Sequence, residues 1–458
     1  MVKPLNIVVI GLGYVGLTTA AALSYIGHYV TGIEKDENKL KLLLNKKSPI
    51  YEQGIEEIMK MTDNRIEFSN DLKADINKAD VIIIVVGTPC KPNGQADSSQ
   101  VEEAAYQISM NLEENKSYII VIKSTVPIGT NRRVNNIIKR AIGERGLNGK
   151  IDVEIASNPE FLREGFALHD FIYPDRIVIG ANGPGSVAKL QQLYQPILEQ
   201  TFMPPQFLPR PASYKLPPFI TTDPVSAEMI KYAANAFLAT KISFINEIAG
   251  LCEKVGADIK EVARGIGLDS RIGPDFLKAG LGWGGSCFPK DTAALVAMGK
   301  ELSYEMHLIE AVRKVNVLQV ERAVEKLQNA SRGVRGRIIG ILGVAFKPGT
   351  DDVRESPSIN LIKMLYERQA HIRAHDPKAL ENAKEVLREL EIEFYDDIYK
   401  MVEDADAIVI ATEWPEYMSI DLEKMSRIMR TPVLLDGRLI FDPIKSKNCG
   451  FVYIGMGR

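Results

Sequence analysis

One cysteine, Cys287, stands between small residues and Phe-Pro-Lys-Asp in the stretch GWGGSCFPKD, residues 282–291. Pro289 suits the first position of a helix over PKDTAALVAMGKEL, which puts Cys287 at or just before the N-cap of that helix. The helix dipole and Lys290 both favour the thiolate, which is the nucleophilic form. We expect the neighbouring glycines to leave room beside the sulfur. The stretch therefore favours a catalytic nucleophile over a buried structural thiol.

The other three cysteines, Cys90, Cys252 and Cys449, are scattered along the chain. They form no CxxC pair and no cluster with histidine, so the sequence predicts neither a disulfide framework nor a metal site. Cys252 falls on the apolar face of a predicted long helix. We interpret all three as structural thiols of a reducing compartment.

Two pairs of polar residues have the spacing that places side chains on one face of a helix or loop. Lys231 and Asn235 lie four residues apart within a predicted helix, and they can point together into a cleft. Glu160 and Glu164, in SNPEFLREG, follow the strand-like VEIA and could order water or accept a proton. Spacing alone leaves the alternative that these are solvated surface charges.

The stretch GLGYVG, with Gly11, Gly13 and Gly16, directly follows a predicted strand and opens a helix. Its glycines permit the turn, the approach of a pyrophosphate and close helix packing. The next strand, YVTGIE, ends in Glu34, where a carboxylate accepts ribose hydroxyls and repels a 2′-phosphate. This pattern predicts NAD, in preference to NADP, as cofactor.

The elements that must position these residues alternate between short apolar strands and helices. NIVVIG, YVTGIE, VIIIVV and YIIVIKS are separated by helical patterns, which indicates βαβ units and a buried parallel sheet. The alternation resumes after Arg332 with GRIIGILGV, HIRAHD, AIVIAT and PVLLDG. Residues 66–89 also align without a gap on residues 392–415, as two helix-then-strand units of one architecture would.

The second α/β half replaces the glycine turn with GVAFKPGTDDVRES, which contains Lys347 and Arg354. This loop cannot bring its backbone as close to a dinucleotide, but it offers cations to a phosphate. A nucleotide other than the dinucleotide is one interpretation. A solvated loop with local ion pairs to Asp351, Asp352 and Glu355 is the other.

The fold class is therefore α/β, with two Rossmann-like doubly wound domains joined by a long central helix and a helical dimerisation region. We predict an NAD-binding domain over residues 1–222, a central helical domain over 223–330 and a second Rossmann-like domain over 331–458. The central helices are a natural dimer surface. The proline-dense segment 201–224 is predicted to be a surface loop, with a lid or a subunit contact as the alternatives.

Composition favours a small-molecule partner. A formal charge of −3 gives no basic field for nucleic acid and no polybasic run for a membrane surface. The N-terminal MVKPLNIVVIG shows no charged leader with a cleavage site, and no apolar run is long enough to span a bilayer. We expect a cytoplasmic protein.

Seven ordered motifs, GLGYVGL, KSTVP, NPEFLREG, SAEMIKYAANAFLATKISFINE, GGSCFPKD, FKPGTDDVRESPS and DGR, closely resemble the UDP-glucose 6-dehydrogenase family over about residues 5–443. The resemblance implies that an NAD-binding and a UDP-binding domain flank a helical core. It implies a four-electron oxidation of UDP-glucose, or a related nucleotide sugar, to a carboxylate with two NAD reduced. In this reaction the aldehyde formed first is held by Cys287 as a thiohemiacetal and is then oxidised to a thioester. The resemblance also implies a homodimer or a higher homo-oligomer.

The resemblance also implies roles for individual residues. Cys287 is the nucleophile, Lys231 and Asn235 stabilise oxyanion charge, Asp291 orients water or acts as a base, and Thr125 with Glu164 positions water. Cofactor contacts carry over to Gly11, Gly13, Val15, Gly16, Glu34, Lys39, Thr88, Thr125, Glu164, Lys290 and Arg354. Substrate contacts carry over to Glu160, Phe161, Leu162, Arg163, Glu164, Lys231, Asn235, Phe276, Leu277, Lys278, Ala279, Gly280, Gly284, Lys347 and Arg438.

The chain departs from the family pattern in places. Leu281 replaces a common aromatic, Glu34 replaces the usual Asp, and segment 201–224 is longer than the usual connection. Sister enzymes for UDP-N-acetylhexosamines usually have a histidine before the cysteine, so GGSCFPKD favours UDP-glucose over those sugars or GDP-mannose. A two-electron hydroxyacid-type dehydrogenase and a non-catalytic nucleotide-sugar sensor are further alternatives.

Overall fold

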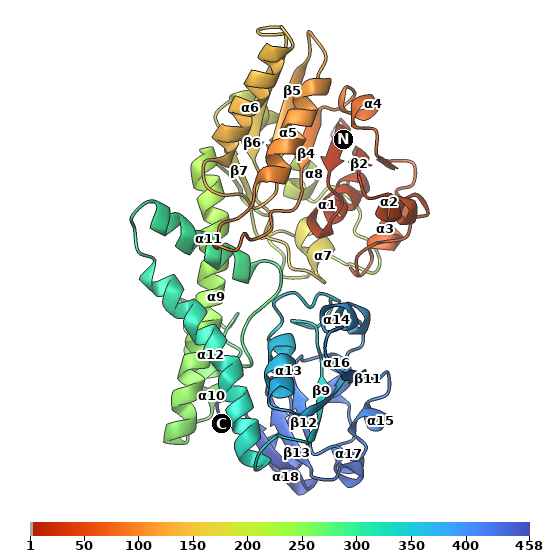
Figure 1. Cartoon of the computed structure of the whole chain (residues 1–458). Helices are drawn as coiled ribbons and strands as arrows, with labels where there is room; N and C mark the ends of the chain where they lie inside the picture. The colour runs from red at the N-terminus through yellow and green to blue at the C-terminus, as the bar shows by residue number, and fades with distance from the viewer. Residues whose placement is uncertain (1–2) are drawn as a thin grey trace. The chain divides into compact units, whose positions relative to one another are not determined.

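The computed structural model describes residues 3–458, and the chain divides into two compact units (Figure 1). The first unit ends at Ala233 and the second begins at Ala234. No helix within residues 3–458 is long and apolar enough to cross a membrane.

The first unit is built on an eight-stranded sheet with the order β3-β2-β1-β4-β5-β6-β7-β8. Its strands are β1 (Asn6–Ile10), β2 (Tyr29–Ile33), β3 (Ile66–Ser69), β4 (Val81–Ile84), β5 (Ser117–Ile122), β6 (Asp152–Ser157), β7 (Ile177–Ala181) and β8 (Phe219–Thr222). All neighbours are parallel except β6 and β7. The first six strands have the order of a dinucleotide-binding fold.

Helices cover both faces of this sheet, because alternate residues of a strand point to opposite sides. Ile7 and Val9 belong to a core that includes α1 (Tyr14–Tyr25), α3 (Ile55–Met61), α7 (Ala167–Ile172) and α8 (Pro184–Glu199). Val8 and Ile10 belong to a core with α4 (Leu72–Ile76), α5 (Ser99–Asn111) and α6 (Thr130–Glu144). Helix α2 (Glu37–Leu44) follows β2.

The second unit contains a six-stranded parallel sheet with the order β11-β10-β9-β12-β13-β14. Its strands are β9 (Ile338–Leu342), β10 (His371–His375), β11 (Ile392–Phe394), β12 (Ala407–Ile410), β13 (Val433–Asp436) and β14 (Val452–Gly455), and its helices are α13 (Pro357–Glu367), α14 (Leu380–Val386), α15 (Ile398–Val402), α16 (Pro415–Met418), α17 (Leu422–Ile428) and α18 (Pro443–Asn448). The two aligned segments of the sequence form β3-α4-β4 and β11-α15-β12, which have equivalent places in the two sheets.

Four helices connect the two sheets along the chain. They are α9 (Pro224–Val255), which crosses the boundary between the units, α10 (Ile259–Gly267), α11 (Phe288–Glu301) and α12 (His307–Ala330). The predicted α/β class, with two Rossmann-like sheets and a long central helix, is confirmed.

The proline-dense segment 201–218 has no regular structure and packs on the first unit. Tyr173 Oη donates to Leu208 O at 2.9 Å, and Tyr214 Oη donates to Pro174 O at 3.1 Å. Phe207 fills the space that a side chain at Gly54 would need. The segment then continues into β8, which is an edge strand of the sheet.

Candidate active site

The glycine turn between β1 and α1 has the geometry of a dinucleotide cradle. Gly11 has φ +91°, and a Cβ at Gly16 would lie 1.8 Å from Gly11 O, so both positions require glycine. A Cβ at Gly13 would meet nothing within 4 Å, and Gly13 is the N-cap of α1 without a side-chain cap. The open N–H groups of this helix end fit a pyrophosphate.

Glu34 follows β2 and lies against the glycine turn. Its side chain is buried, and its Oε2 accepts from Leu12 N at 3.2 Å while Oε1 accepts from Asp36 N at 3.0 Å. A carboxylate fixed at this place fits the hydroxyls of an adenosine ribose. Val15 lies in the first turn of α1, and Lys39 is exposed in the first turn of α2.

Two threonines meet where β4 and β5 end. Thr88 Oγ1 donates to Thr125 O at 2.8 Å, so the loops after both strands are tied together. In parallel sheets, ligands bind at this carboxyl end of the strands. Both predicted contacts therefore lie at the edge expected of a cofactor site.

Lys231 forms a buried ion pair with Glu160, at 2.9 Å between Nζ and Oε1. The two side chains are only 4% and 6% exposed, which excludes the alternative of solvated surface charges for this pair. Burial by itself raises the pKa of Glu160, but the charge and hydrogen bond of Lys231 outweigh burial and hold that pKa below its usual range. Lys231 Nζ also lies 5.5 Å from the ring centre of Phe161.

The remaining residues of the EFLREG segment have different surroundings. Leu162 N donates to Glu160 Oε2 at 2.6 Å, which fixes the turn. Arg163 is exposed and pairs with Asp170 at 2.7 Å. The charge of Glu164 contributes to the raised pKa of Tyr14, so this carboxylate lies near the Tyr14 hydroxyl, while Glu160 is the one that pairs with Lys231.

Lys123, in KSTVP, is a site residue that the sequence did not single out. Its Nζ donates to Asn158 Oδ1 at 3.2 Å, and its side chain is buried close to the Lys231 and Glu160 pair. Burial, with a smaller contribution from the charge of Lys231, lowers the pKa of Lys123 to about 8 against the opposing effect of Glu160. A lysine directly after an apolar strand, in a motif already quoted, is the signal that could have identified it.

Cys287 is the N-cap of α11, as the sequence predicted, and Pro289 occupies the first turn. Ser286 Oγ lies 3.5 Å from its sulfur. One turn into the helix, the fully buried Asp291 accepts from Asn235 Nδ2 at 2.6 Å and pairs with Lys290 Nζ at 2.5 Å. The thiol therefore stands at a helix N-terminus beside a carboxylate held by an amide and an ammonium group.

The loop before Cys287 is fixed from several directions. Trp283 Nε1 donates to Ser243 Oγ of α9 at 2.9 Å, and Trp283 N donates to Asn316 Oδ1 of α12 at 2.8 Å. Gly280 N donates to Asn246 Oδ1 at 2.8 Å. The loop is thus rigidly attached to the two helices that flank it.

The glycines before Cys287 have a packing role, because other groups occupy the positions where their side chains would stand. The expectation that they leave room beside the sulfur stays a prediction. A Cβ at Gly282 would lie 2.6 Å from the Asn316 side chain, and one at Gly284 would lie 2.1 Å from Glu355 O. A Cβ at Gly285 would meet the Phe346 ring at 2.8 Å. The glycines allow the loop to pack directly on residues of the second Rossmann-like half.

The predicted nucleotide-sugar contacts of the second unit gather around the same loop. Phe276 has φ +62° and packs on Phe288, and a Cβ at Gly280 would lie 2.8 Å from Gly437 O. Leu277 and Ala279 are buried, whereas Lys278 is exposed. The strained backbone of segment 276–280 is therefore held against the DGR loop.

The cationic residues of the second half are held by their neighbours. Arg438 donates to Ala411 O at 2.7 Å and pairs with Glu413 at 3.2 Å. Arg354 is mostly exposed and pairs with Asp352 at 2.7 Å, as the alternative of local ion pairs predicted. Lys347 lies 5.5 Å from the ring centre of Phe346.

The two groups of residues offer complementary chemistry. The first unit supplies a dinucleotide cradle and a buried ammonium group suited to stabilise an oxyanion. The second unit supplies a thiol at a helix N-terminus, which is suited to attack a carbonyl carbon. Within residues 3–458 no cluster of three or more His, Cys, Asp or Glu side chains could hold a metal ion.

Three models of one protein family match the chain in order. They describe the NAD-binding domain (residues 5–198), the central domain (residues 225–317) and the UDP-binding domain (residues 340–443) of the UDP-glucose/GDP-mannose dehydrogenase family.

Named relatives agree with these matches over nearly the full length. UDP-glucose 6-dehydrogenase TuaD of Bacillus subtilis is 44% identical and covers 99% of this chain and 93% of its own. UDP-glucose 6-dehydrogenase of Rhizobium meliloti is 41% identical over 99% and 100%. A solved UDP-glucose dehydrogenase from Pyrobaculum islandicum is 36% identical with a TM-score of 0.87, covering 100% of this chain and 98% of its own.

Proposed function

Because the chain belongs to the UDP-glucose/GDP-mannose dehydrogenase family, it is an NAD-dependent dehydrogenase acting on a CH–OH group, and we propose that its substrate is UDP-glucose. The product is UDP-glucuronate, formed by a four-electron oxidation. The observation that carries the proposal is Cys287 at the N-terminus of α11, beside Asp291. A two-electron dehydrogenase has no use for a nucleophilic thiol at its reaction centre.

The first half of the reaction converts the sugar's primary alcohol to an aldehyde. NAD, which would be held by the glycine turn and Glu34, would supply the hydride acceptor, and each of the two oxidation stages would use one NAD. Asp291 accepts the hydroxyl proton, and Lys231 stabilises the negative charge that develops on the oxygen. The buried carboxylate of Glu160, 2.9 Å from Lys231 Nζ, favours the charged form of this ammonium group.

The second half passes through the thiol. The Cys287 thiolate forms a bond to the aldehyde carbon, and the resulting alkoxide is stabilised by Lys231 and Asn235. Loss of the second hydride restores the carbonyl as a thioester. Water, positioned by Thr125 and a glutamate of segment 160–164, adds to the carbonyl, and the C–S bond breaks to release the carboxylate and the thiolate.

The glutamate that positions water is Glu160 or Glu164. Glu160 pairs with Lys231, whereas the charge of Glu164 acts on Tyr14, a residue of the GLGYVG motif. We therefore assign the water to Glu160 and a cofactor contact to Glu164, which separates two roles that the sequence resemblance had given to Glu164.

The substrate is tested by comparing kcat/KM for UDP-glucose, UDP-N-acetylglucosamine and GDP-mannose with NAD in excess. We expect UDP-glucose to be preferred by at least about 100-fold, because a site that hydrogen-bonds one nucleotide sugar leaves its polar groups unpaired with another. A preference for an N-acetyl sugar would favour the sister activity. The fold does not distinguish them, since a UDP-D-ManNAc dehydrogenase from Pyrococcus horikoshii has a TM-score of 0.83 at 26% identity.

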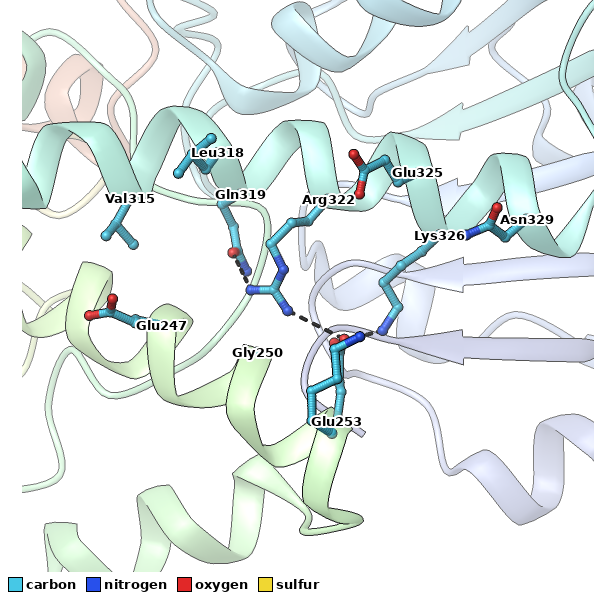
Figure 2. Close-up of a pocket in the computed structure, with 11 residues that line it drawn as sticks. Glu247, Gly250, Glu253, Val315, Leu318, Gln319, Arg322, Glu325, Lys326 and Asn329 are labelled. Carbon is cyan, nitrogen blue, oxygen red and sulfur yellow. Dashed lines mark hydrogen bonds and ion pairs between the residues drawn. The ribbon is translucent and has the colours of Figure 1, made fainter.

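We also propose a homodimer formed through α9. Its residues Phe237, Phe244, Leu251 and Val255 recur at helical spacing and are 48% to 69% exposed, which is unusual for large apolar side chains on one face. Figure 2 shows Arg322 and Lys326 of α12 directed at Glu253 of α9, at 3.3 and 2.6 Å. These ion pairs tie α12 to the helix that presents the apolar face.

Sedimentation velocity tests the dimer. The protein is expected to sediment as a dimer, and Phe244→Glu is expected to shift it toward the monomer because a charge replaces apolar contact area. Leu302→Glu, at another exposed apolar residue, is the matched control. A monomeric protein, or a dimer unaffected by Phe244→Glu, would contradict this interface.

A further inference from the structure

Glu52 is a buried carboxylate in the loop before α3 that the reaction described above does not use. It is 6% exposed. Its Oε2 accepts from the Tyr14 hydroxyl and from Gly165 N, the latter at 2.9 Å, and its Oε1 accepts from Leu168 N at 3.2 Å. Burial raises the pKa of Glu52, and these hydrogen bonds oppose the rise. Burying a carboxylate is unfavourable, so the hydrogen bonds of Glu52 are what stabilise it in this position.

The groups bonded to Glu52 belong to two different segments of the site. Tyr14 is the first residue of α1 and lies inside GLGYVG. Gly165 and Leu168 connect the EFLRE segment to the first turn of α7, which has no side-chain cap from Phe166. Gly165 N also donates to the Tyr14 hydroxyl, so the three groups form one closed network.

Other contacts fix the loop that carries Glu52. The Tyr14 hydroxyl is 3.2 Å from Tyr51 O. The proline-dense segment lies over the same loop, because Phe207 packs on Gly54, and it is bonded to Tyr173 at the end of α7. Helix α1 packs on both α3 and α7, which lie next to it in Figure 1. Glu52 is therefore placed by a rigid surrounding.

We propose that Glu52 is a positioning residue for the dehydrogenase reaction, linking the cofactor's glycine turn through Tyr14 to the substrate segment 160–168. Gly165 directly follows Glu164 and lies five residues after Glu160, so the network fixes the end of the segment that carries both carboxylates. Misplacement of reacting groups by about 1 Å can cost about 100-fold in rate. This inference rests on the proposed function, because that function gives the two segments their ligands.

The kinetic test uses Glu52→Gln, Tyr14→Phe and the double variant, with Glu56→Gln as control. Glu56 lies four residues further on, and its carboxylate bonds to Ser48 N at the surface. We expect kcat with UDP-glucose to fall about 10- to 100-fold in Glu52→Gln and about 10-fold in Tyr14→Phe. In both variants, the KM for UDP-glucose should change less than about 3-fold. The double variant should be no worse than Glu52→Gln, because the two groups act as one unit.

A second measurement does not depend on the identity of the sugar. Hydrogen–deuterium exchange is followed with and without NADH for peptides covering 48–56 and 165–173. We expect NADH to slow exchange of both peptides in the wild type and in Glu56→Gln, and to lose this effect in Tyr14→Phe and Glu52→Gln. Tyr14→Phe removes only one hydroxyl, so this variant can test the network even if Glu52→Gln does not fold.

The outcomes separate the two proposals. If NADH slowed exchange equally in all variants, or if the losses in kcat of Glu52→Gln and Tyr14→Phe added up in the double variant, the role of Glu52 would be overturned. If the wild type does not oxidise UDP-glucose while the exchange pattern is as expected, the proposed substrate is wrong and the coupling of the two segments stands.

Discussion

At the scale of single residues, the buried pair of Lys231 and Glu160 is the feature with the largest expected effect. We expect Lys231→Met to lower kcat by at least about 1,000-fold, because it removes the oxyanion partner. Truncation of one partner also leaves a buried charge, which costs about 3–5 kcal/mol in the free energy of unfolding.

The double variant of Lys231→Met with Glu160→Gln separates these two effects. It should regain much of the lost stability in urea unfolding while staying inactive, and Lys254→Met, at an exposed position of α9, should match the wild type. A Lys231→Met protein with near-normal kcat would contradict the assigned role.

Lys123 gives a pH dependence of stability. Its pKa is about 8 in the folded protein against an ordinary value of 10.5, so between these values the unfolded state binds more protons. This residue therefore makes the free energy of unfolding increase with pH, with a slope of at most about 1.4 kcal/mol per pH unit.

Urea unfolding at pH 8 and pH 9.5 checks this expectation. The gain in stability over this interval should be about 1–2 kcal/mol larger in the wild type than in Lys123→Met, while Lys116→Met, at the exposed start of β5, should behave as the wild type. Identical pH profiles for all three proteins would show that Lys123 does not titrate in this range.

At the scale of elements, the loop before Cys287 depends on close backbone packing. A Cβ at Gly284 would lie 2.1 Å from Glu355 O, which is backbone and cannot move aside. We expect Gly284→Ala to lower the melting temperature by several degrees and kcat by about 10-fold or more. In Gly265→Ala, within α10, the added Cβ meets nothing within 4 Å, so that variant should be as stable as the wild type or slightly more so.

Differential scanning calorimetry and initial rates check both variants. A Gly284→Ala protein that melts and turns over like Gly265→Ala would mean that the loop does not need its close approach to residues 346–355.

Elements with strong local patterns were predictable from the sequence. The apolar strands, the glycine turn, the long helix and the cysteine at a helix N-cap all have signals within about ten residues, and the structure has each of them. The start of α11 lies at Phe288, one residue before the position that Pro289 suggested, because proline is tolerated throughout a helix's first turn.

Partnerships between distant residues were not predictable. Glu160 pairs with Lys231, which lies 71 residues further along the chain, and Asn235 meets Asp291 from another element. Glu52 lies in a loop without a recognisable motif, and Lys123 looks like any lysine after a strand. Tertiary packing alone selects these partners, and a single sequence has no record of it.

At the scale of the whole molecule, the three predicted domains, 1–222, 223–330 and 331–458, stay a prediction. The family models match residues 5–198, 225–317 and 340–443, and the compact units divide at Ala233. The long helix α9 is shared along the chain by both units. Its exposed apolar face is the basis of the proposed dimer.

Cofactor selectivity is a property of the intact protein that thermal unfolding can read. A ligand that binds only the folded state stabilises it by about 2.7 kcal/mol at 100 times its Kd. We expect NAD to raise the melting temperature of the full chain clearly, and NADP at the same concentration to raise it much less, because Glu34 repels a 2′-phosphate. Glu34→Gln should narrow the difference. Equal shifts with both cofactors in the wild type would contradict the assignment of Glu34.

The central claim is that one thiol holds the sugar between two oxidation stages, and the number of NADH formed per UDP-glucose tests it most directly. With limiting UDP-glucose and excess NAD, the wild type should form two NADH and one UDP-glucuronate for each sugar, and Cys287→Ala should form no UDP-glucuronate. A ratio of one NADH in the wild type, or formation of the acid by Cys287→Ala, would contradict the mechanism.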